Sequence, residues 1–306
     1  MWIATNSSGG QSAARPAHSK FADTVATISL LIKATLLLLG CSVRDMVFPL
    51  YDDNSDLTTA PIINYAIIAI NIIVFVFLQG LGANEIFTYA FSTVPLEIIT
   101  GHDVITPSHL IIHPLTGQQL FIPGLQPTPV PVYLTLLTSM FMHGGIAHIA
   151  GNMLFLWIFG DNVEDRLGHI RYLIFYLLTG VLASLAHVFS TLVFAADPNA
   201  LLIPSLGASG AISGVLGGYI VLFPHRRVIV LSFYLLTEVP AWIAIGIWFA
   251  FQLFSGLGML GAGSTQGGVA YAAHIGGFIA GLVLVKVFTI GRARRPPISL
   301  PPSYME

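Results

Sequence analysis

The sequence contains few charged residues and almost no cysteine. Only 8% of its 306 residues are Asp, Glu, Lys or Arg, whereas a soluble domain carries about 25%. With 55% hydrophobic residues and a mean hydropathy of +0.82, this shortage excludes an ordinary soluble protein and predicts a polytopic membrane protein. The single cysteine, Cys41, excludes an intrachain disulfide framework. A net charge of −2 without a dense basic patch gives no reason to expect a nucleic-acid partner.

Six apolar segments approach the length of ~20 residues that a helix needs to cross a bilayer. A backbone exposed to lipid must satisfy its own hydrogen bonds, so each segment is expected to be a helix. The predicted fold class is therefore an all-α membrane protein, a bundle of six transmembrane helices. The segments cover residues 64–82, 139–160, 172–194, 206–223, 239–258 and 269–289.

Positive charge is distributed unevenly among the loops between these segments. All twelve Lys and Arg residues lie at the termini, in the loops after the second and fourth segments, or at the edge of that side. Residues 83–138 contain none. The positive-inside rule then predicts that both termini are cytoplasmic and that residues 83–138 form a large outer loop. A bacterial inner (plasma) membrane is the expected location, with an organelle membrane of bacterial ancestry as the alternative.

The beginning of the chain does not fit this pattern. Residues 24–43 are apolar, but Lys33 at their centre costs roughly 2.5–3.5 kcal/mol in a membrane-spanning helix. Three interpretations stay open: a translation start assigned too early, an interfacial helix, and a lipoprotein-like cleavage site at residues 38–41. The expected organisation is an N-terminal extension, a membrane domain and a cytoplasmic tail, over residues 1–45, 46–290 and 291–306.

Two segments contain polar residues that could react with each other. Ser209, flanked by Gly207 and Gly210, opens the fourth segment, and His274 lies in the sixth. Polar side chains within a membrane are expensive, so each needs a reason. One interpretation is packing, because glycines recur every four residues after Gly210 and would let another helix approach closely. The other is catalysis: if the glycine faces of both segments meet, a neutral His274 can take the hydroxyl proton of Ser209 and make it a nucleophile.

The second segment adds His143, His148 and Asn152. His148 and Asn152 are four residues apart and share one helix face, from which both could donate hydrogen bonds to a developing oxyanion. Such donors are typically worth about 2.7–4 kcal/mol of barrier, and the backbone N–H of Ser209 could supply another. His143 is expected to be structural, for example by bonding to the outer loop. At ~1.5 Å per residue, His148, Ser209 and His274 all fall in the outer half of the bilayer, a common depth that unrelated packing roles would not explain.

The motifs, with their order and spacing, resemble those of the rhomboid family of intramembrane serine proteases over about residues 46–290. The matching segments are 137–168 (LTSMFMHGGIAHIAGNMLFLWIFGDNVEDRLG), 207–214 (GASGAISG) and 273–281 (AHIGGFIAG), which are similar to the second helix, the nucleophile motif and the histidine helix of bacterial members. Glu164 and Arg166 match a structural polar pair in the loop after the second helix. The resemblance implies six transmembrane helices and cleavage of transmembrane substrates without a cofactor or metal.

The same resemblance assigns a role to each site residue. It implies a Ser–His dyad, with Ser209 as the nucleophile and His274 as the general base. His148, Asn152 and the backbone N–H of Ser209 would form the oxyanion hole. The expected supporting residues are His143, Gly207 and Gly210.

The sequence departs from the family pattern at two places. Leu134-Thr135 stands where many relatives have Trp-Arg in the first outer loop. Ser213 stands four residues after the serine, where some relatives place a tyrosine that stacks on the histidine. Neither change removes a reacting group, but both leave open how the loop is anchored and how the ring of His274 is held. Support from another helix is one answer to the second question.

The predicted function is that of an intramembrane serine endopeptidase that cleaves transmembrane or juxtamembrane segments of single-span proteins in the lipid bilayer. Three alternatives compete with this function. A catalytically inactive rhomboid-like binding protein should have lost the serine or the histidine. A metal site of His143, His148 and His274 would lack the HExxH motif or carboxylate ligand usual in zinc proteases. A transporter or channel should show broken helices, a repeat or charged residues along a pore.

Overall fold

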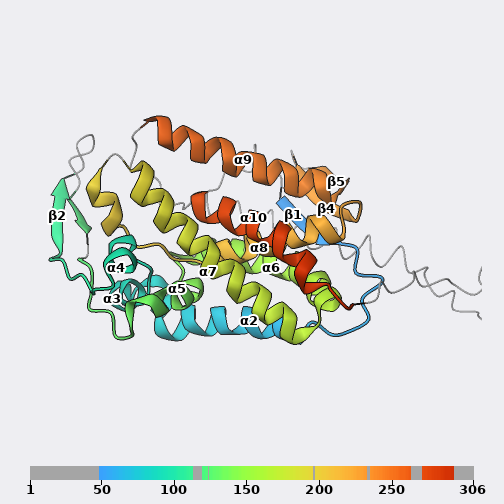
Figure 1. The fold of residues 1–306 in the computed structure, drawn as a ribbon, viewed down its shortest axis with the longest axis horizontal. Coiled ribbons are helices and arrows are strands. Elements are labelled where there is room, and N and C mark those ends of the chain that lie inside the picture. Colours follow the sequence, from blue (N-terminus) through green and yellow to red (C-terminus); the bar gives the residue numbers. More distant parts are fainter. Residues whose placement is uncertain are drawn as a thin grey trace, which may run out of the picture. The chain divides into compact units, whose positions relative to one another are not determined.

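The computed structural model describes residues 48–112, 119–122, 124–195, 197–232, 235–262 and 271–292, which are mostly helical (Figure 1). The predicted extension at residues 1–45 lies outside the described residues, as does nearly all of the predicted tail at 291–306. Each of the six predicted apolar segments contains a helix. These helices are α2 (Ile62–Ile73, continued by a π-helical turn over Val74–Leu78), α6 (Ile146–Leu167), α7 (His169–Phe194), α8 (Ser209–Leu222), α9 (Ala241–Ala262) and α10 (Tyr271–Phe288).

Length and hydropathy divide these helices into two groups. Within the described part of the chain, α7 and α10 are each long and apolar enough to cross a membrane. The segment Val132–Phe141 and α6 give a third span if the bent pair is counted as one. The remaining helical segments are apolar but shorter: α2 with its π turn, α8, and Ala241–Phe254 of α9. The chain is thus an integral membrane protein, while the count of six spans stays a prediction.

The second apolar segment differs from the continuous helix predicted over 139–160. Two short 3₁₀ turns and the four-residue helix α5 (Thr135–Thr138) precede α6, and the chain bends by 81° before α6 begins at Ile146. The break contains His143 and two glycines, which leave the backbone free to turn. At its other end α6 continues to Leu167. Glu164 and Arg166 therefore lie in the helix. The prediction that placed both residues in the following loop was wrong.

Helix α8 is contacted by α6, α7 and α10 (Figure 1), and its residues from Gly210 to Tyr219 are buried. Its closest neighbour is α10. A Cβ atom added to Gly277 would collide with the carbonyl oxygen of Gly210, and one added to Gly281 would collide with that of Gly214. The glycine faces of the fourth and sixth segments do meet, and the backbones of α8 and α10 approach each other as small-residue faces allow.

Short elements occupy the predicted outer loop and the ends of the bundle. The loop contains α3 (Glu85–Ala90), α4 (Pro95–Thr100) and an antiparallel hairpin of β2 (His109–Ile112) and β3 (Gln119–Ile122). A second sheet has the order β1–β4–β5, from Phe48–Asp52, Arg227–Ser232 and Leu235–Pro240. The all-α prediction missed both sheets, because strands of four to six residues in loops leave no signal in a search for runs of about 20 apolar residues.

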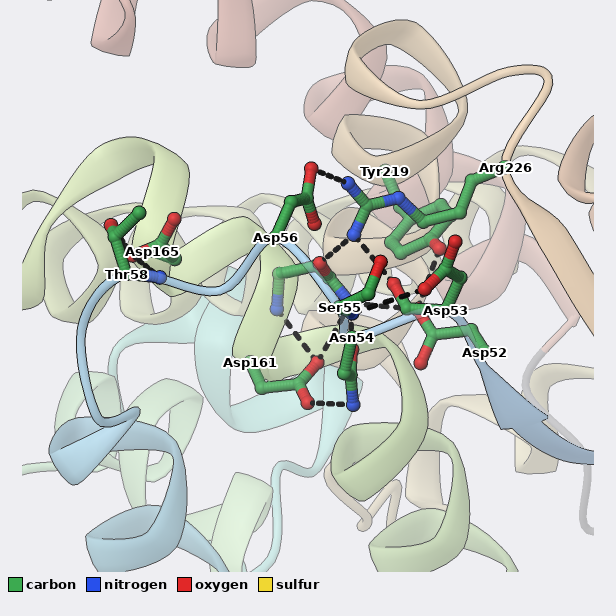
Figure 2. Close-up of polar contacts among 11 residues, drawn as sticks. Asp52, Asp53, Asn54, Ser55, Asp56, Thr58, Asp161, Asp165, Tyr219 and Arg226 are labelled. Atoms are coloured by element: carbon green, nitrogen blue, oxygen red, sulfur yellow. Dashed lines mark hydrogen bonds and ion pairs between the residues drawn. The ribbon is translucent and has the colours of Figure 1, made fainter. Parts of the chain in front are cut away.

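A polar cluster joins the segment before α2 to the ends of α6 and α8 (Figure 2). The carboxylate of Asp52 accepts hydrogen bonds from the hydroxyl of Tyr219 at 2.6 Å and from the side chain of Asn162 at 2.7 Å. Next to it, Asn54 donates to Asp161 at 2.8 Å. Asp52 is only 1% exposed, and burial raises its pKa to about 7. This cluster holds the strand β1 at the end of the bundle away from Ser209.

Glu164 provides the N-terminal cap of α2. Pro61 precedes the helix and offers no side-chain cap. The two carboxylate oxygens of Glu164 accept hydrogen bonds from the backbone N–H groups of Ile63 and Asn64, at 2.9 and 2.7 Å. First-turn N–H groups have no partner within their own helix, and a negative charge near them also interacts favourably with the helix dipole. The buried end of α6 therefore fixes where α2 begins.

Candidate active site

Ser209 is the first residue of α8. It follows a sharp turn at Gly207, whose φ of 124° is a conformation that L side chains rarely adopt. A Cβ atom at Gly207 would also lie 2.9 Å from the ring of His148. Only glycine satisfies both conditions, and its N–H is fixed by the carbonyl of Ser139 at 2.9 Å. The turn brings the hydroxyl of Ser209 to the end of the helix where N–H groups are free of intrahelical partners.

His274 lies opposite Ser209 on α10. Its Nε2 atom is 2.7 Å from the Oγ atom of Ser209, which is within the range that direct proton transfer requires. The two residues come from different helices, and the contact depends on the close approach of Gly277 to the carbonyl of Gly210 described above. The structure thus brings together the two residues that the sequence predicted as nucleophile and base.

The other ring nitrogen of His274 contacts α9. Its Nδ1 atom is 2.7 Å from Oε1 of Gln252, a side chain only 7% exposed. One turn earlier on α9, the indole of Trp248 lies 6.0 Å from the imidazole, centroid to centroid, at an angle of 38°. Ser213 bonds elsewhere, since its hydroxyl donates to the carbonyl of Ser209 at 2.6 Å. The ring of His274 is therefore held from another helix, α9.

Gln252 did not appear among the predicted site residues, although the sequence contained a signal for it. It is a lone amide in an otherwise apolar stretch of α9, and a polar side chain within a membrane helix needs a reason. The sequence does not reveal that its partner is His274, because hydropathy does not tell which neighbouring helix a side chain faces.

His148, in the first turn of α6, approaches the site from the other side. Its Nδ1 atom accepts a hydrogen bond from the backbone N–H of Gly144 at 3.3 Å. An imidazole that accepts at Nδ1 carries its proton at Nε2 when neutral. The Nε2 edge of the ring borders Gly207, as does the hydroxyl of Ser209. His148 can therefore offer an N–H donor close to the serine.

Asn152 lies one turn further along the same face of α6. It is 8% exposed, and its side-chain nitrogen has no hydrogen-bond partner among the described residues. A buried donor without a partner costs about 1–3 kcal/mol. An acceptor that binds to this amide would recover that cost. The structure keeps His148 and Asn152 on one helix face, as their spacing predicted.

His143 lies in the break before α6, not within a helix, and is fully buried. Neither ring nitrogen has a hydrogen-bond partner among the described residues. Its ring stands edge-on to those of His148 and Phe75, at centroid distances of 5.2 and 6.5 Å. The side chain of Gln79 holds its backbone, accepting from the N–H at 3.0 Å and donating to the carbonyl at 2.9 Å. Gln79 precedes the predicted outer loop, so these two bonds of His143 do not go to that loop, contrary to the expectation.

A small cavity of about 20 Å³ adjoins Ser209. Its lining includes the serines Ser139, Ser184 and Ser205, with Gly207 and Ala273. A space of this size holds about one water molecule, provided that polar groups are there to bind it, and three hydroxyl-bearing residues meet that condition. Water therefore has a place beside the serine.

The described residues can also be compared with the ligand sets that metal ions require. No group of three or more His, Cys, Asp or Glu side chains there is placed to hold a metal ion. Of the three histidines considered for such a site, His274 directs its two ring nitrogens at Ser209 and Gln252.

Comparison with known proteins identifies the family of this site. A family model described as a rhomboid domain matches residues 131–290, which include Ser209, His274, His148, Asn152 and Gln252. The chain is 34% identical over 159 residues to "Rhomboid protein 1, mitochondrial" of Saccharomyces cerevisiae, which covers 52% of this chain and 43% of the relative.

Two other relatives come from a bacterium and a plant. The chain is 32% identical over 159 residues to "Rhomboid protease GluP" of Bacillus subtilis, covering 52% of this chain and 26% of that protein. It is 32% identical over 162 residues to "Rhomboid-like protein 11, chloroplastic" of Arabidopsis thaliana, covering 51% of this chain and 52% of that protein. The chain thus spans about half or less of the length of these relatives.

Proposed function

Because the chain belongs to the rhomboid family, we propose that it is an intramembrane serine endopeptidase with Ser209 as the nucleophile and His274 as the general base. The observation that carries this proposal is the 2.7 Å contact between Nε2 of His274 and Oγ of Ser209. A serine hydroxyl is a weak nucleophile until a neighbouring base takes its proton. One of the relatives, from Bacillus subtilis, is itself named a rhomboid protease.

The first chemical step is the attack of Ser209 on the carbonyl carbon of the peptide bond to be cut. As the new C–O bond forms, the hydroxyl proton passes from Oγ to Nε2 of His274, and the carbonyl oxygen becomes an oxyanion. The donors that we propose for this oxyanion are the N–H at Nε2 of His148, whose ring borders Gly207 as Ser209 does, the unpaired side-chain amide of Asn152, and the N–H groups at the start of α8. Donors of this kind act by meeting charge that develops only in the transition state.

The second step releases the amine product and then the acid product. His274 returns its proton to the leaving nitrogen as the C–N bond breaks, which leaves an acyl-enzyme on Ser209. Water then attacks the ester carbonyl, with His274 again as the base. The cavity next to Ser139, Ser184 and Ser205 is suited to supply this water from within an otherwise apolar bundle.

The depth of the site agrees with cleavage near the outer membrane surface. His148, Ser209 and His274 all lie in the first or second turn of α6, α8 and α10. We propose that these helices run in the same direction, within a domain of six membrane spans over residues 46–290, with both termini on the cytoplasmic side. A helical substrate must unwind to expose its peptide bond, so single-span substrates with Gly or Pro near the cut should be preferred.

The compartment is proposed from the charge distribution. Clusters such as Arg226-Arg227 and Arg292-Arg294-Arg295 favour one side of the membrane, which is the cytoplasmic side in a bacterial plasma membrane. The relatives carry mitochondrial, chloroplast and bacterial names, so an organelle membrane is the second candidate. There the matrix or stroma would take the place of the cytoplasm.

A covalent probe tests the proposal without a known substrate. A fluorophosphonate should label the wild type at Ser209, label the His274→Ala variant much more slowly, and leave the Ser209→Ala variant unlabelled. A rhomboid-like binding protein without activity is the alternative, and it predicts no labelling of the wild type. Labelling of equal rate in the wild type and in His274→Ala would contradict the role of the histidine.

A further inference from the structure

Gln252 makes the second of the two hydrogen bonds of His274. Its Oε1 atom lies 2.7 Å from Nδ1 of His274, while Nε2 of the same ring lies 2.7 Å from Oγ of Ser209. Three helices thus contribute to one chain of contacts, with Ser209 on α8, His274 on α10 and Gln252 on α9.

The atom that faces Nδ1 determines which ring nitrogen carries the proton. A carbonyl oxygen can only accept, so Oε1 of Gln252 requires N–H at Nδ1 of His274. A neutral imidazole has one such proton, and its Nε2 atom is then left as an acceptor facing the hydroxyl of Ser209. The other tautomer would place N–H at Nε2, and the ring could not take the proton of the serine.

An amide is suited to this position in an apolar bundle. A charged carboxylate on a membrane helix is expensive, whereas an amide oxygen accepts the same hydrogen bond without a net charge. The side chain is 7% exposed, so water does not compete freely for the bond. Trp248, one turn earlier on α9, lies beside the ring of His274, with 6.0 Å between the ring centroids.

We propose that Gln252 is a positioning residue that completes a Ser209–His274–Gln252 triad, by accepting from Nδ1 and holding the tautomer in which Nε2 is the base. This inference rests on the proposed serine-protease function. In this proposal α9 supports the ring of His274. Ser213, four positions after the nucleophile, does not, because its hydroxyl donates to the backbone carbonyl of Ser209.

Two variants separate the hydrogen bond from simple packing. Gln252→Leu keeps a similar volume but removes the acceptor, and kcat should fall by about 10- to 100-fold with KM nearly unchanged, less than the loss of a charged triad residue. Gln252→Glu keeps an acceptor oxygen, and its activity should stay well above that of the Leu variant. A carboxylate favours a protonated imidazole, so the acid limb of kcat/KM should move to higher pH in Gln252→Glu. Phe251→Leu, a change at an exposed neighbour on α9, is the matched control and should change neither quantity.

A spectrum of the wild type adds a readout that needs no activity and no Gln252 variant. In protein labelled with ¹⁵N-histidine, the signals lost in His274→Ala belong to this ring, and they should show a proton on Nδ1 and none on Nε2. A proton on Nε2, an unchanged kcat in Gln252→Leu, or a Glu variant as weak as the Leu variant would each overturn the inference. A wild type that neither cleaves nor labels would instead contradict the protease proposal, and the spectrum would still report on the hydrogen bond.

Discussion

Nε2 of His274 lies 2.7 Å from Oγ of Ser209, although the two residues are 65 positions apart in the chain. The contact crosses from α8 to α10, where the carbonyls of Gly210 and Gly214 meet Gly277 and Gly281. Two reacting residues on separate helices can meet only if the distance between those helices is fixed within narrow limits. The glycines determine that distance, so packing and proposed chemistry depend on the same residues.

Adding a methyl group at Gly281 should weaken the contact between α8 and α10. Its Cβ atom would collide with the carbonyl oxygen of Gly214, which belongs to a buried backbone and cannot rotate away. Overpacking of this kind costs typically about 1–3 kcal/mol, so Gly281→Ala should unfold at a lower temperature in detergent.

Gly246→Ala is the matched control for this change. Gly246 lies on α9, and a Cβ atom there would meet nothing within 4 Å. Alanine is the better helix former by about 1 kcal/mol, so this variant should be as stable as the wild type or more so. Equal thermal stability of the two alanine variants would contradict the packing account.

Removing either proposed oxyanion donor should slow the chemical step. His148→Ala and Asn152→Ala should each lower kcat by about 10²- to 10³-fold with a smaller change in KM, because these donors act on charge that forms in the transition state. Steady-state kinetics with a peptide substrate would measure both constants.

Asn71→Ala controls for the loss of any buried asparagine. Asn71 is fully buried on α2, and its amide donates to the carbonyl of Ile67 at 2.9 Å. Its removal should reduce stability while kcat of the folded protein is kept. A fall in kcat as large as that of Asn152→Ala would argue against a specific role for Asn152.

Sequence reasoning recovered some parts of this molecule and missed others, for identifiable reasons. Helices formed in all six predicted segments, because hydropathy averaged over about 20 residues reports apolar composition well. The same average conceals the 81° bend before Ile146, since the short helices on the other side of the break are also apolar. A hydroxyl and an imidazole stand out in such segments, so the sequence pointed to Ser209 and His274, and the structure brings these two side chains into contact. Gln252 stands out equally, but its role depends on which helix it faces, and that is a property of the packing alone.

The stability of the polar cluster around Asp52 should depend on pH. Burial raises the pKa of this carboxyl group from its ordinary value of 3.8 to about 7. Between these two values the folded protein binds a proton that the unfolded chain releases, so the free energy of unfolding decreases as pH rises through this window. The neighbouring Asp161 adds to the shift, and Tyr219 and Arg226 oppose it.

Thermal unfolding in detergent from pH 5 to pH 8 would measure this effect. The wild type should lose stability over the range, and Asp52→Asn should lose less, because the side chain at this position can no longer ionise. Asp53→Asn is the control, since hydrogen bonds from Ser55 lower the pKa of Asp53 and its replacement should leave the decline in place. An equal decline in Asp52→Asn and the wild type would rule out Asp52 as its source.

Glu164 should matter for stability and not for chemistry. Its carboxylate caps two N–H groups at the start of α2, and leaving buried donors unpaired costs about 1–3 kcal/mol. Glu164→Ala should therefore lower the unfolding temperature, and Glu164→Gln, which keeps one acceptor oxygen, should fall between it and the wild type. Glu85→Ala, at an exposed first-turn position of α3, should have little effect. A Glu164→Ala protein with unchanged stability would contradict the capping role.

The most direct test of the central claim is cleavage of a membrane-protein substrate by purified protein in detergent, with EDTA present. The substrate should be a single-span protein with a Gly- and Ala-rich segment next to its outer membrane boundary. The wild type, Ser209→Ala and His274→Ala would be compared on a gel. We predict cleavage by the wild type alone, which would establish a serine–histidine protease that needs no chelatable metal. Cleavage that persists in Ser209→Ala would contradict the account.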